Sequence, residues 1–284
     1  GAPFGASTVA NSTVAIDVLH PTRRAEGIGY YGLSNNIASA IAPALAIYLL
    51  NITHNYNLLF WLAFLTSAIG LGINATLKLN PRELIKDKPK ISLDRFFLLK
   101  GWSEGLSMMC LSFSYGVTAT YVAIYGKETL NISGGSALFF MLLSLGLILS
   151  RLVGSRTLRQ GKITQNASVG ILISLCGYLM FALLQNPIGY YCSAFIVGLG
   201  NGHMWPAYQT MFLNLAPHTQ RGTANSSILI SWDIGVGLGT LIGGAIAEHC
   251  GYQQAFIASA LVNLIGIIIF FGYAKNDFLK NKLR

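Results

Sequence analysis

The chain has 284 residues, of which 53% are hydrophobic and only 10% are charged, and its formal net charge is +9. Because a soluble domain carries about 25% charged residues, this composition excludes an ordinary soluble protein. The positive charge does not indicate nucleic-acid binding, since Lys and Arg are confined to connecting segments and no basic helix face alternates with aromatic residues. The four scattered cysteines have neither the spacing of a zinc site nor that of a disulfide framework.

Nine apolar segments follow one another along the chain. A membrane-spanning helix needs about twenty apolar residues, and residues 27–50 supply them without a formal charge. A shorter piece precedes them at residues 1–19. Further spans are predicted at residues 58–77, 96–125, 137–158, 167–184, 188–215, 222–247 and 255–273. The sequence therefore predicts an all-α, multi-pass membrane protein.

The basic residues lie on one side of this series of spans. Of nineteen Lys and Arg residues, only Lys127 lies in a loop of the opposite parity. Basic loops of polytopic membrane proteins face the cytoplasm, where they meet anionic lipid. The pattern predicts insertion in the cell (inner) membrane, with the basic loops and the C-terminus cytoplasmic.

An internal repeat relates two parts of the chain. An offset of 197 residues places Arg24 on Arg221 and replaces small residues by small residues, for example Ala42 by Gly239. Such a duplication is typical of transporters. The same offset, together with a start at Gly-Ala-Pro rather than Met, predicts that about a hundred residues precede the chain, enough for three helices and part of a fourth. We therefore expect twelve helices in the whole protein.

With the repeat in place, the chain resembles the major facilitator superfamily, and within it the arabinose-efflux-like and drug-efflux-like branch. The resemblance covers essentially the whole chain and rests on EGIGYYGLSNNIASAIAPALAIYL and RGTANSSILISWDIGVGLGTLIGG. It implies two six-helix bundles around a central cavity and alternating access by rocking. On this basis residues 1–77 are helices 4–6 of the first bundle, 78–95 are a basic cytoplasmic linker, 96–274 are helices 7–12, and 275–284 are a cytoplasmic tail. The family's basic loop motif lacks its Asp here and is reduced to Gly154, Arg156, Arg159, Gly161 and Lys162.

Two titratable residues lie near the middle of predicted spans. Asp233 is the only formal charge between residues 222 and 247. An intramembrane carboxylate is a candidate functional group by default, so Asp233 is predicted either to couple protons or substrate or to make a polar contact with another helix. His203 can relay protons, although a lone His on an apolar helix is often only hydrogen-bonded. Asn36 is the neutral repeat counterpart of Asp233.

Other polar and aromatic residues are candidates for the cavity wall and for the cytoplasmic side. Pro206 is expected to kink the helix that carries His203. Arg151 is expected either to extend to the lipid headgroups or to contact a gate, and Glu104 to pair with Lys100 in an i,i+4 arrangement. The predicted cavity-lining residues are Trp205, Tyr208, Gln209, Tyr115, Tyr121 and Asn36. The predicted cytoplasmic gate or interface residues are Arg24, Glu104, Arg151, Arg156 and Arg221.

These features favour a secondary active transporter without a cofactor, which exports a small organic molecule by means of the proton gradient. Uptake of a sugar or another metabolite by the same mechanism is the first alternative. A non-transporting membrane sensor or scaffold is the second. No HExxH, GxSxG or paired-carboxylate motif indicates an enzyme. The expected partners are the substrate and the lipid bilayer, without nucleic acid, and the full-length protein is expected to work as a monomer.

Overall fold

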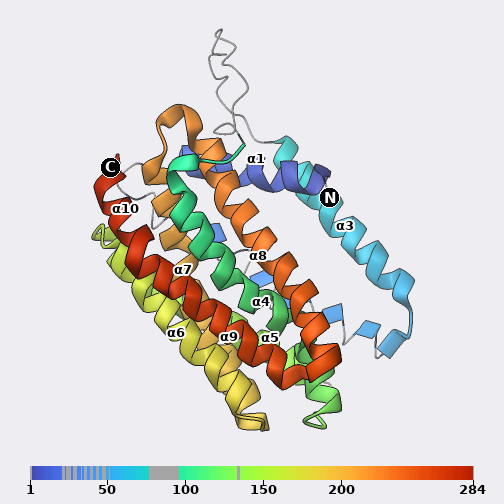
Figure 1. The fold of residues 1–284 in the computed structure, drawn as a ribbon. Coiled ribbons are helices and arrows are strands. Elements are labelled where there is room, and N and C mark those ends of the chain that lie inside the picture. Colours follow the sequence, from blue (N-terminus) through green and yellow to red (C-terminus); the bar gives the residue numbers. More distant parts are fainter. Residues whose placement is uncertain are drawn as a thin grey trace.

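The computed structural model describes residues 2–20, 52–76, 96–132 and 135–283, together with isolated positions between 23 and 50. Within these residues the chain is helical and contains no β-strand. Most helices run side by side as a tilted bundle, and α1 and α3 lie at its edge (Figure 1). Composition and hydropathy therefore predicted the fold class correctly.

Eight long helices account for the described part of the chain, and most of their ends fall within a few residues of the predicted ones. They are α1 (Ala2–Val18), α3 (Tyr56–Ala75), α4 (Trp102–Glu128), α5 (Gly135–Arg159), α6 (Ile163–Leu183), α7 (Pro187–Leu215), α8 (Arg221–Cys250) and α9 (Tyr252–Ile269). Short 3₁₀ turns at Leu99–Gly101 and His218–Gln220 precede α4 and α8. A π-helical turn, Phe270–Ala274, joins α9 to α10 (Lys275–Asn281). The predicted span 27–50 lies largely outside the described residues.

Six of the described helical segments are long and apolar enough to cross a membrane, and α7 is not among them. Its sequence explains the difference, because α7 carries Asn201, His203, Gln209 and Asn214. Most residues of α7 are nevertheless buried by its neighbours. A central helix that is shielded from lipid on most sides can carry more polar groups than a peripheral one.

Helices α4 to α9 pack as one bundle in which glycines bring backbones close together. Helix α7 packs mainly against α5 and α6, and α4 mainly against α8 and α9. A Cβ on Gly235 or Gly239 of α8 would overlap backbone oxygens of α4, and one on Gly198 of α7 would overlap a backbone oxygen of α5. Small residues permit this kind of contact in membranes. At Gly237, by contrast, a Cβ would meet no atom within 4 Å.

Two groups of buried apolar side chains fill the bundle. The first lies toward the end where the loops before α6 and α8 are found and includes Tyr208, Phe212 and Phe270. The second lies toward the other end, where Phe139, Phe181 and Phe256 form aromatic contacts with centroid distances of 4.6–5.7 Å. The outer surface carries many exposed aliphatic side chains, including Val153 and Ile188, as expected for helices that face lipid.

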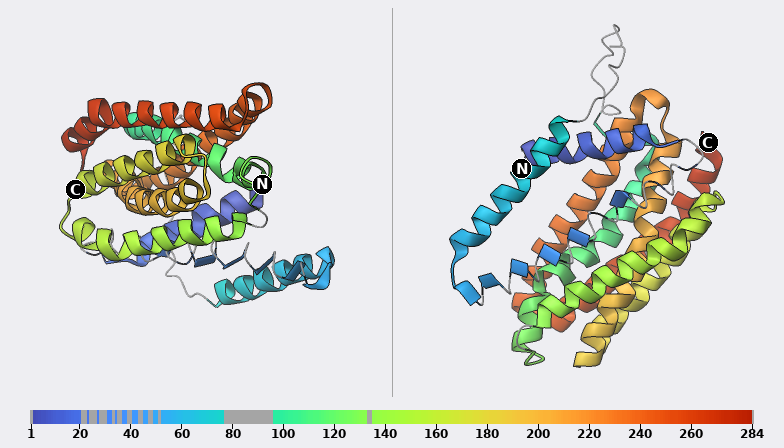
Figure 2. Two further views of the ribbon diagram at one scale, coloured as in Figure 1. Left: turned by 90° about the horizontal axis from the view of Figure 1, so that it is seen from below. Right: turned by 180° about the vertical axis from the view of Figure 1, so that it is seen from behind.

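The N-terminal helices are attached to this bundle at one end. Helix α1 contacts α8, near the start of α8 (Figure 1). Helix α3 has no buried residue, and Asn74 of α3 donates a hydrogen bond to Asn11 Oδ1 of α1 over 3.1 Å. Seen from below, α3 lies well outside the group formed by α4 to α9 (Figure 2, left).

The last residues of the chain fold back onto the bundle. Phe278 of α10 is buried in the first apolar group, and the Leu283 N–H donates to the Asn214 carbonyl of α7 over 2.8 Å. The segment predicted as a tail is thus anchored to the C-terminal bundle.

Candidate functional site

Asp233 lies near the middle of α8, at the border between its packed face and its open face. Ser231, Gly235 and Gly239 lie on the side packed against other helices, whereas Ile234 and Leu238 are exposed. The Asp233 side chain is itself exposed among the described residues. The structure therefore leaves this carboxylate accessible, rather than sealing it inside α4 to α9.

Three aromatic residues on three helices form a cluster, and one of them, Trp232, directly precedes Asp233 in the sequence. Trp232 of α8 contacts Tyr115 of α4 and Trp205 of α7, each with a centroid distance of 5.2 Å. All three side chains are half-buried. Partly exposed aromatic rings with mixed orientations can receive an apolar or aromatic ligand. Tyr115 and Trp205, predicted separately as cavity residues, are therefore brought together through Trp232, a residue that the sequence analysis did not include.

Tyr121, also predicted to line the cavity, is tied to α8 by its hydroxyl group. The Tyr121 hydroxyl donates to the Thr240 carbonyl over 2.8 Å, and the hydroxyls of Thr120 and Thr240 lie 3.0 Å apart. These bonds connect α4 and α8 nearer the end of the bundle formed by the α8–α9 turn. Tyr121 acts here as a contact between helices.

Gln209 joins a polar network that links the N-terminal helices to the bundle. Its Nε2 donates to Asn225 Oδ1 over 2.9 Å. Asn225 Nδ2 in turn donates to Ser12 Oγ over 2.5 Å and lies 3.5 Å from Thr13 Oγ1. The network thus joins α1, α7 and α8, and most of it is buried. Asn225 was missed in the sequence because one Asn near the end of a span carries no distinctive signal.

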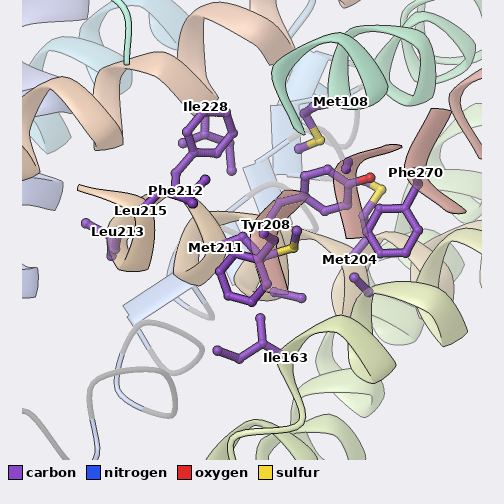
Figure 3. Close-up of a cluster of buried hydrophobic side chains, with 14 of the residues drawn as sticks. Met108, Ile163, Met204, Tyr208, Met211, Phe212, Leu213, Leu215, Ile228 and Phe270 are labelled. Atoms are coloured by element: carbon purple, nitrogen blue, oxygen red, sulfur yellow. The ribbon is translucent and has the colours of Figure 1, made fainter. Parts of the chain in front are cut away.

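Tyr208 does not line an open surface. Its side chain is 0% exposed and lies next to Met204 and Phe270 in the first apolar group (Figure 3). Its hydroxyl is 2.7 Å from Ser107 Oγ, which also donates to the Gly266 carbonyl over 2.8 Å. The cavity prediction for Tyr208 is wrong for this structure, because Tyr208 packs toward α4 and the end of α9 whereas Trp205 packs toward α8.

His203 is held in a close contact of α5, α6 and α7. Its Nδ1 lies 2.9 Å from the Leu199 carbonyl, which can only accept, so Nδ1 carries a proton and Nε2 stays available. Asn166 of α6 donates to the His203 carbonyl over 2.8 Å. A Cβ on Gly154 of α5 would be 3.1 Å from both Asn166 Oδ1 and His203 Cδ2. The absence of a side chain at Gly154 therefore leaves room for the His203 imidazole.

Arg151 of α5 points into the protein. Only 5% of its side chain is exposed, which contradicts the expected extension to lipid headgroups. Its Nε and Nη1 are buried without a hydrogen-bond partner among the described residues, and its charge acts on His203. Leu152 and Val153, which follow it, are exposed. Arg151 is buried because it lies on the face of α5 that is directed into the protein. The length of its side chain does not decide whether it reaches the lipid headgroups.

Glu104 is buried at the start of α4, and it makes no ion pair with Lys100 in the described structure. Its side chain is 0% exposed, Oε1 has no partner, and Oε2 accepts from Ser103 Oγ over 3.1 Å. The expected i,i+4 contact fails because Lys100 belongs to the 3₁₀ turn Leu99–Gly101, whose register differs from that of an α-helix. Glu104 faces the interior, where the charge of Asp277 from α10 acts on it.

Of the remaining predicted residues, Arg156 and Arg221 lie at the end that carries the loops before α6 and α8. Arg156 is exposed near the end of α5, and Arg221 is the first residue of α8. Arg24 and Asn36 lie outside the described residues. The predicted set thus divides into an accessible face at Asp233 and the aromatic cluster, a buried group at Arg151 and His203, and a network around Gln209.

Comparison with known proteins identifies the family to which this chain belongs. A sequence model described as the Major Facilitator Superfamily matches residues 1–239 and 169–282. The chain belongs to this superfamily. It is therefore part of a multi-pass membrane protein of the major facilitator type, as the series of apolar segments and the repeat predicted.

Two curated members of the superfamily are efflux proteins by name. The staphylopine export protein of Staphylococcus aureus is 21% identical over 270 residues, which are 90% of this chain and 67% of that protein. The multidrug resistance protein MdtG of Erwinia billingiae is 30% identical over 98 residues, 34% of this chain and 24% of that protein. The chain thus spans between a quarter and two thirds of the length of these relatives.

Solved major facilitator structures share the fold. The transporter FucP in its outward conformation superposes with a TM-score of 0.66 at 13% identity, covering 93% of this chain and 72% of that one. A bacterial homologue of the human lysosomal transporter Spinster superposes with a TM-score of 0.57 at 16% identity, covering 96% of this chain and 75% of that one. At such identities the likeness describes the fold alone.

Proposed function

We propose that the chain is part of a proton-coupled exporter of a small organic molecule that works by alternating access. Export is supported by two relatives, which are named for staphylopine export and multidrug resistance. The aromatic cluster of Tyr115, Trp205 and Trp232 would receive an apolar or aromatic portion of the substrate. The accessible carboxylate of Asp233 is the observation that carries the proposal.

Two properties of Asp233 support proton coupling. A charged carboxylate in the middle of a span costs about 2.5–3.5 kcal/mol or more, and binding a proton removes this charge. Because Asp233 is exposed on α8 beside Trp232, its charge can change without breaking an internal contact of α4 to α9. Protonation at one side of the membrane and release at the other would link the proton gradient to the movement of the bundles.

The network of Ser12, Asn225 and Gln209 is proposed as a closed gate. It connects α1 with α7 and α8 at one end of the molecule, which also carries the basic residues Arg159, Lys162 and Arg221. We assign this end to the cytoplasm of a cell with the transporter in its inner membrane. Residues 1–77 and 96–274 would rock against each other about the linker 78–95, and one full-length copy would suffice.

The test uses the full-length protein reconstituted in vesicles with an imposed pH gradient. A panel of toxic compounds and sugars identifies the transported molecule, and the direction of its flux separates export from uptake. No substrate-dependent flux for any compound would favour a sensor or scaffold.

Substitution of Asp233 tests the coupling step. In Asp233→Asn, gradient-driven flux is expected to fall to background while the protein stays folded in detergent, because the amide cannot carry the proton. Glu248→Gln, at an exposed position of the same helix, is the matched control and should transport normally. Normal gradient-driven flux in Asp233→Asn would remove Asp233 from the mechanism.

A further inference from the structure

Arg151 is a buried cation without a counter-charge in the described structure. Its Nε and Nη1 are enclosed and have no hydrogen-bond partner among the residues that the structure describes. A guanidinium cannot give up its charge inside a protein. Enclosing an unpaired ion is unfavourable by several kcal/mol, and a buried polar group left unsatisfied needs an explanation. A group with negative charge that binds at Arg151 would supply one.

Gly32 and His203 lie next to Arg151. Gly32 packs against the guanidinium, since a Cβ at this position would lie 3.2 Å from Nη2. His203 of α7 is within electrostatic range of Arg151 and has an available Nε2. No described acidic side chain faces Arg151. Gly32 belongs to the first proposed bundle and Arg151 to the second, so this contact lies at the boundary between them.

We propose that Arg151, assisted by His203, binds a carboxylate group of the transported molecule at this boundary. This inference rests on the proposed transport function and narrows its substrate class to organic acids or zwitterions. The planar guanidinium binds a carboxylate through two parallel hydrogen bonds. Rocking of the bundles would separate Gly32 from Arg151 and admit the ligand.

The experiment measures the thermal unfolding of the purified full-length protein at constant ionic strength. The probes are sodium benzoate and sodium acetate, each compared with its neutral amide, benzamide or acetamide. At about ten times the Kd a carboxylate is expected to raise Tm by about 3 °C, whereas the amides leave it unchanged. In Arg151→Gln this carboxylate effect is expected to disappear, and in Arg151→Lys to be reduced, because the ammonium lacks the planar fork.

A charge-matched control and the ligand-free proteins complete the test. Lys127→Gln removes one cation from an exposed position and should keep the full benzoate effect. Without ligand, Arg151→Gln should unfold no lower than the unmodified protein, since it removes an unpaired charge. Equal shifts with carboxylates and amides, or a carboxylate effect that survives in Arg151→Gln, would overturn the proposal.

A large fall of Tm in ligand-free Arg151→Gln would also overturn it. That result would mean that Arg151 stabilises the ligand-free protein and is not an unpaired charge that awaits a ligand. Because binding is measured without a gradient, Asp233→Asn should keep the benzoate effect. Failure of proton coupling and failure of anion binding are therefore distinguishable.

Discussion

Trp205 and Tyr208 lie three residues apart on α7, and they have different neighbours. Trp205 contacts Trp232 of α8 and stays half-buried. Tyr208 is enclosed and shares a hydrogen bond with Ser107 of α4. This difference cannot be predicted from the sequence of α7, since polar and aromatic residues occur all around the helix. Only packing shows which aromatic group is available for a ligand.

The enclosed position of Tyr208 leads to a prediction about stability. Tyr208→Phe keeps the ring and removes the hydroxyl, so that Ser107 retains only its bond to the Gly266 carbonyl. The free energy of unfolding is expected to fall by about 1 kcal/mol, while substrate flux stays unchanged. Thermal unfolding and vesicle flux measure the two effects. A changed apparent KM at unchanged Tm would place Tyr208 at the ligand after all.

At the scale of the helices, α4 and α8 approach each other through glycines on one side of α8. A Cβ on Gly239 would overlap the Phe113 carbonyl of α4, whereas one on Gly237 would meet no atom within 4 Å. Positions two residues apart on a helix face different directions, so Gly239 faces α4 whereas Gly237 does not. The sequence alone groups both as close-contact residues, because it shows small residues without showing the neighbouring backbone.

This difference gives a matched pair of substitutions. Gly239→Ala is expected to destabilise the protein by about 1–3 kcal/mol, as overpacking does. Gly237→Ala is expected to be neutral or to stabilise α8 by up to about 1 kcal/mol, because Ala favours the helix. Thermal unfolding of the two variants in the same detergent decides the matter. Equal losses would mean that α8 packs in another register.

At the scale of the whole molecule, one buried network joins the N-terminal helices to the bundle, and the outward side of α8 stays open. Ser12 and Asn225 are in direct contact, whereas Asp233, about two turns along α8, is exposed. This arrangement agrees with a transporter that is closed at the end near the basic loops.

A reversible cross-link tests the gate. In a protein whose four cysteines are replaced, Ser12→Cys with Asn225→Cys is expected to react with a short bifunctional thiol reagent and to lose most of its flux. If the reagent contains a disulfide, cleavage of the cross-link by a reductant is expected to restore transport. The control is Asn11→Cys with Asn74→Cys, which joins α1 to α3 within one bundle and should leave flux intact. Full flux in the cross-linked gate variant would contradict rocking at this contact.

Much of the architecture could be predicted because the ends of membrane spans are set by polarity, which is visible along a single sequence. Helices α5 to α8 begin and end within a few residues of the predicted positions for this reason. The direction in which a side chain points is not visible in the same way. Arg151 was expected at the lipid headgroups and Glu104 beside Lys100, but rotation of α5 and a 3₁₀ turn place both in the interior.

The folded end of the chain has a practical consequence for observing transport. Because Phe278 is buried and Leu283 is bonded to α7, a dye attached at exposed Asn281 would move with the C-terminal bundle as one body. A second dye at exposed Val18 of α1 would report on the other side of the gate. Energy transfer between these two dyes would then follow single cycles of opening and closing in real time.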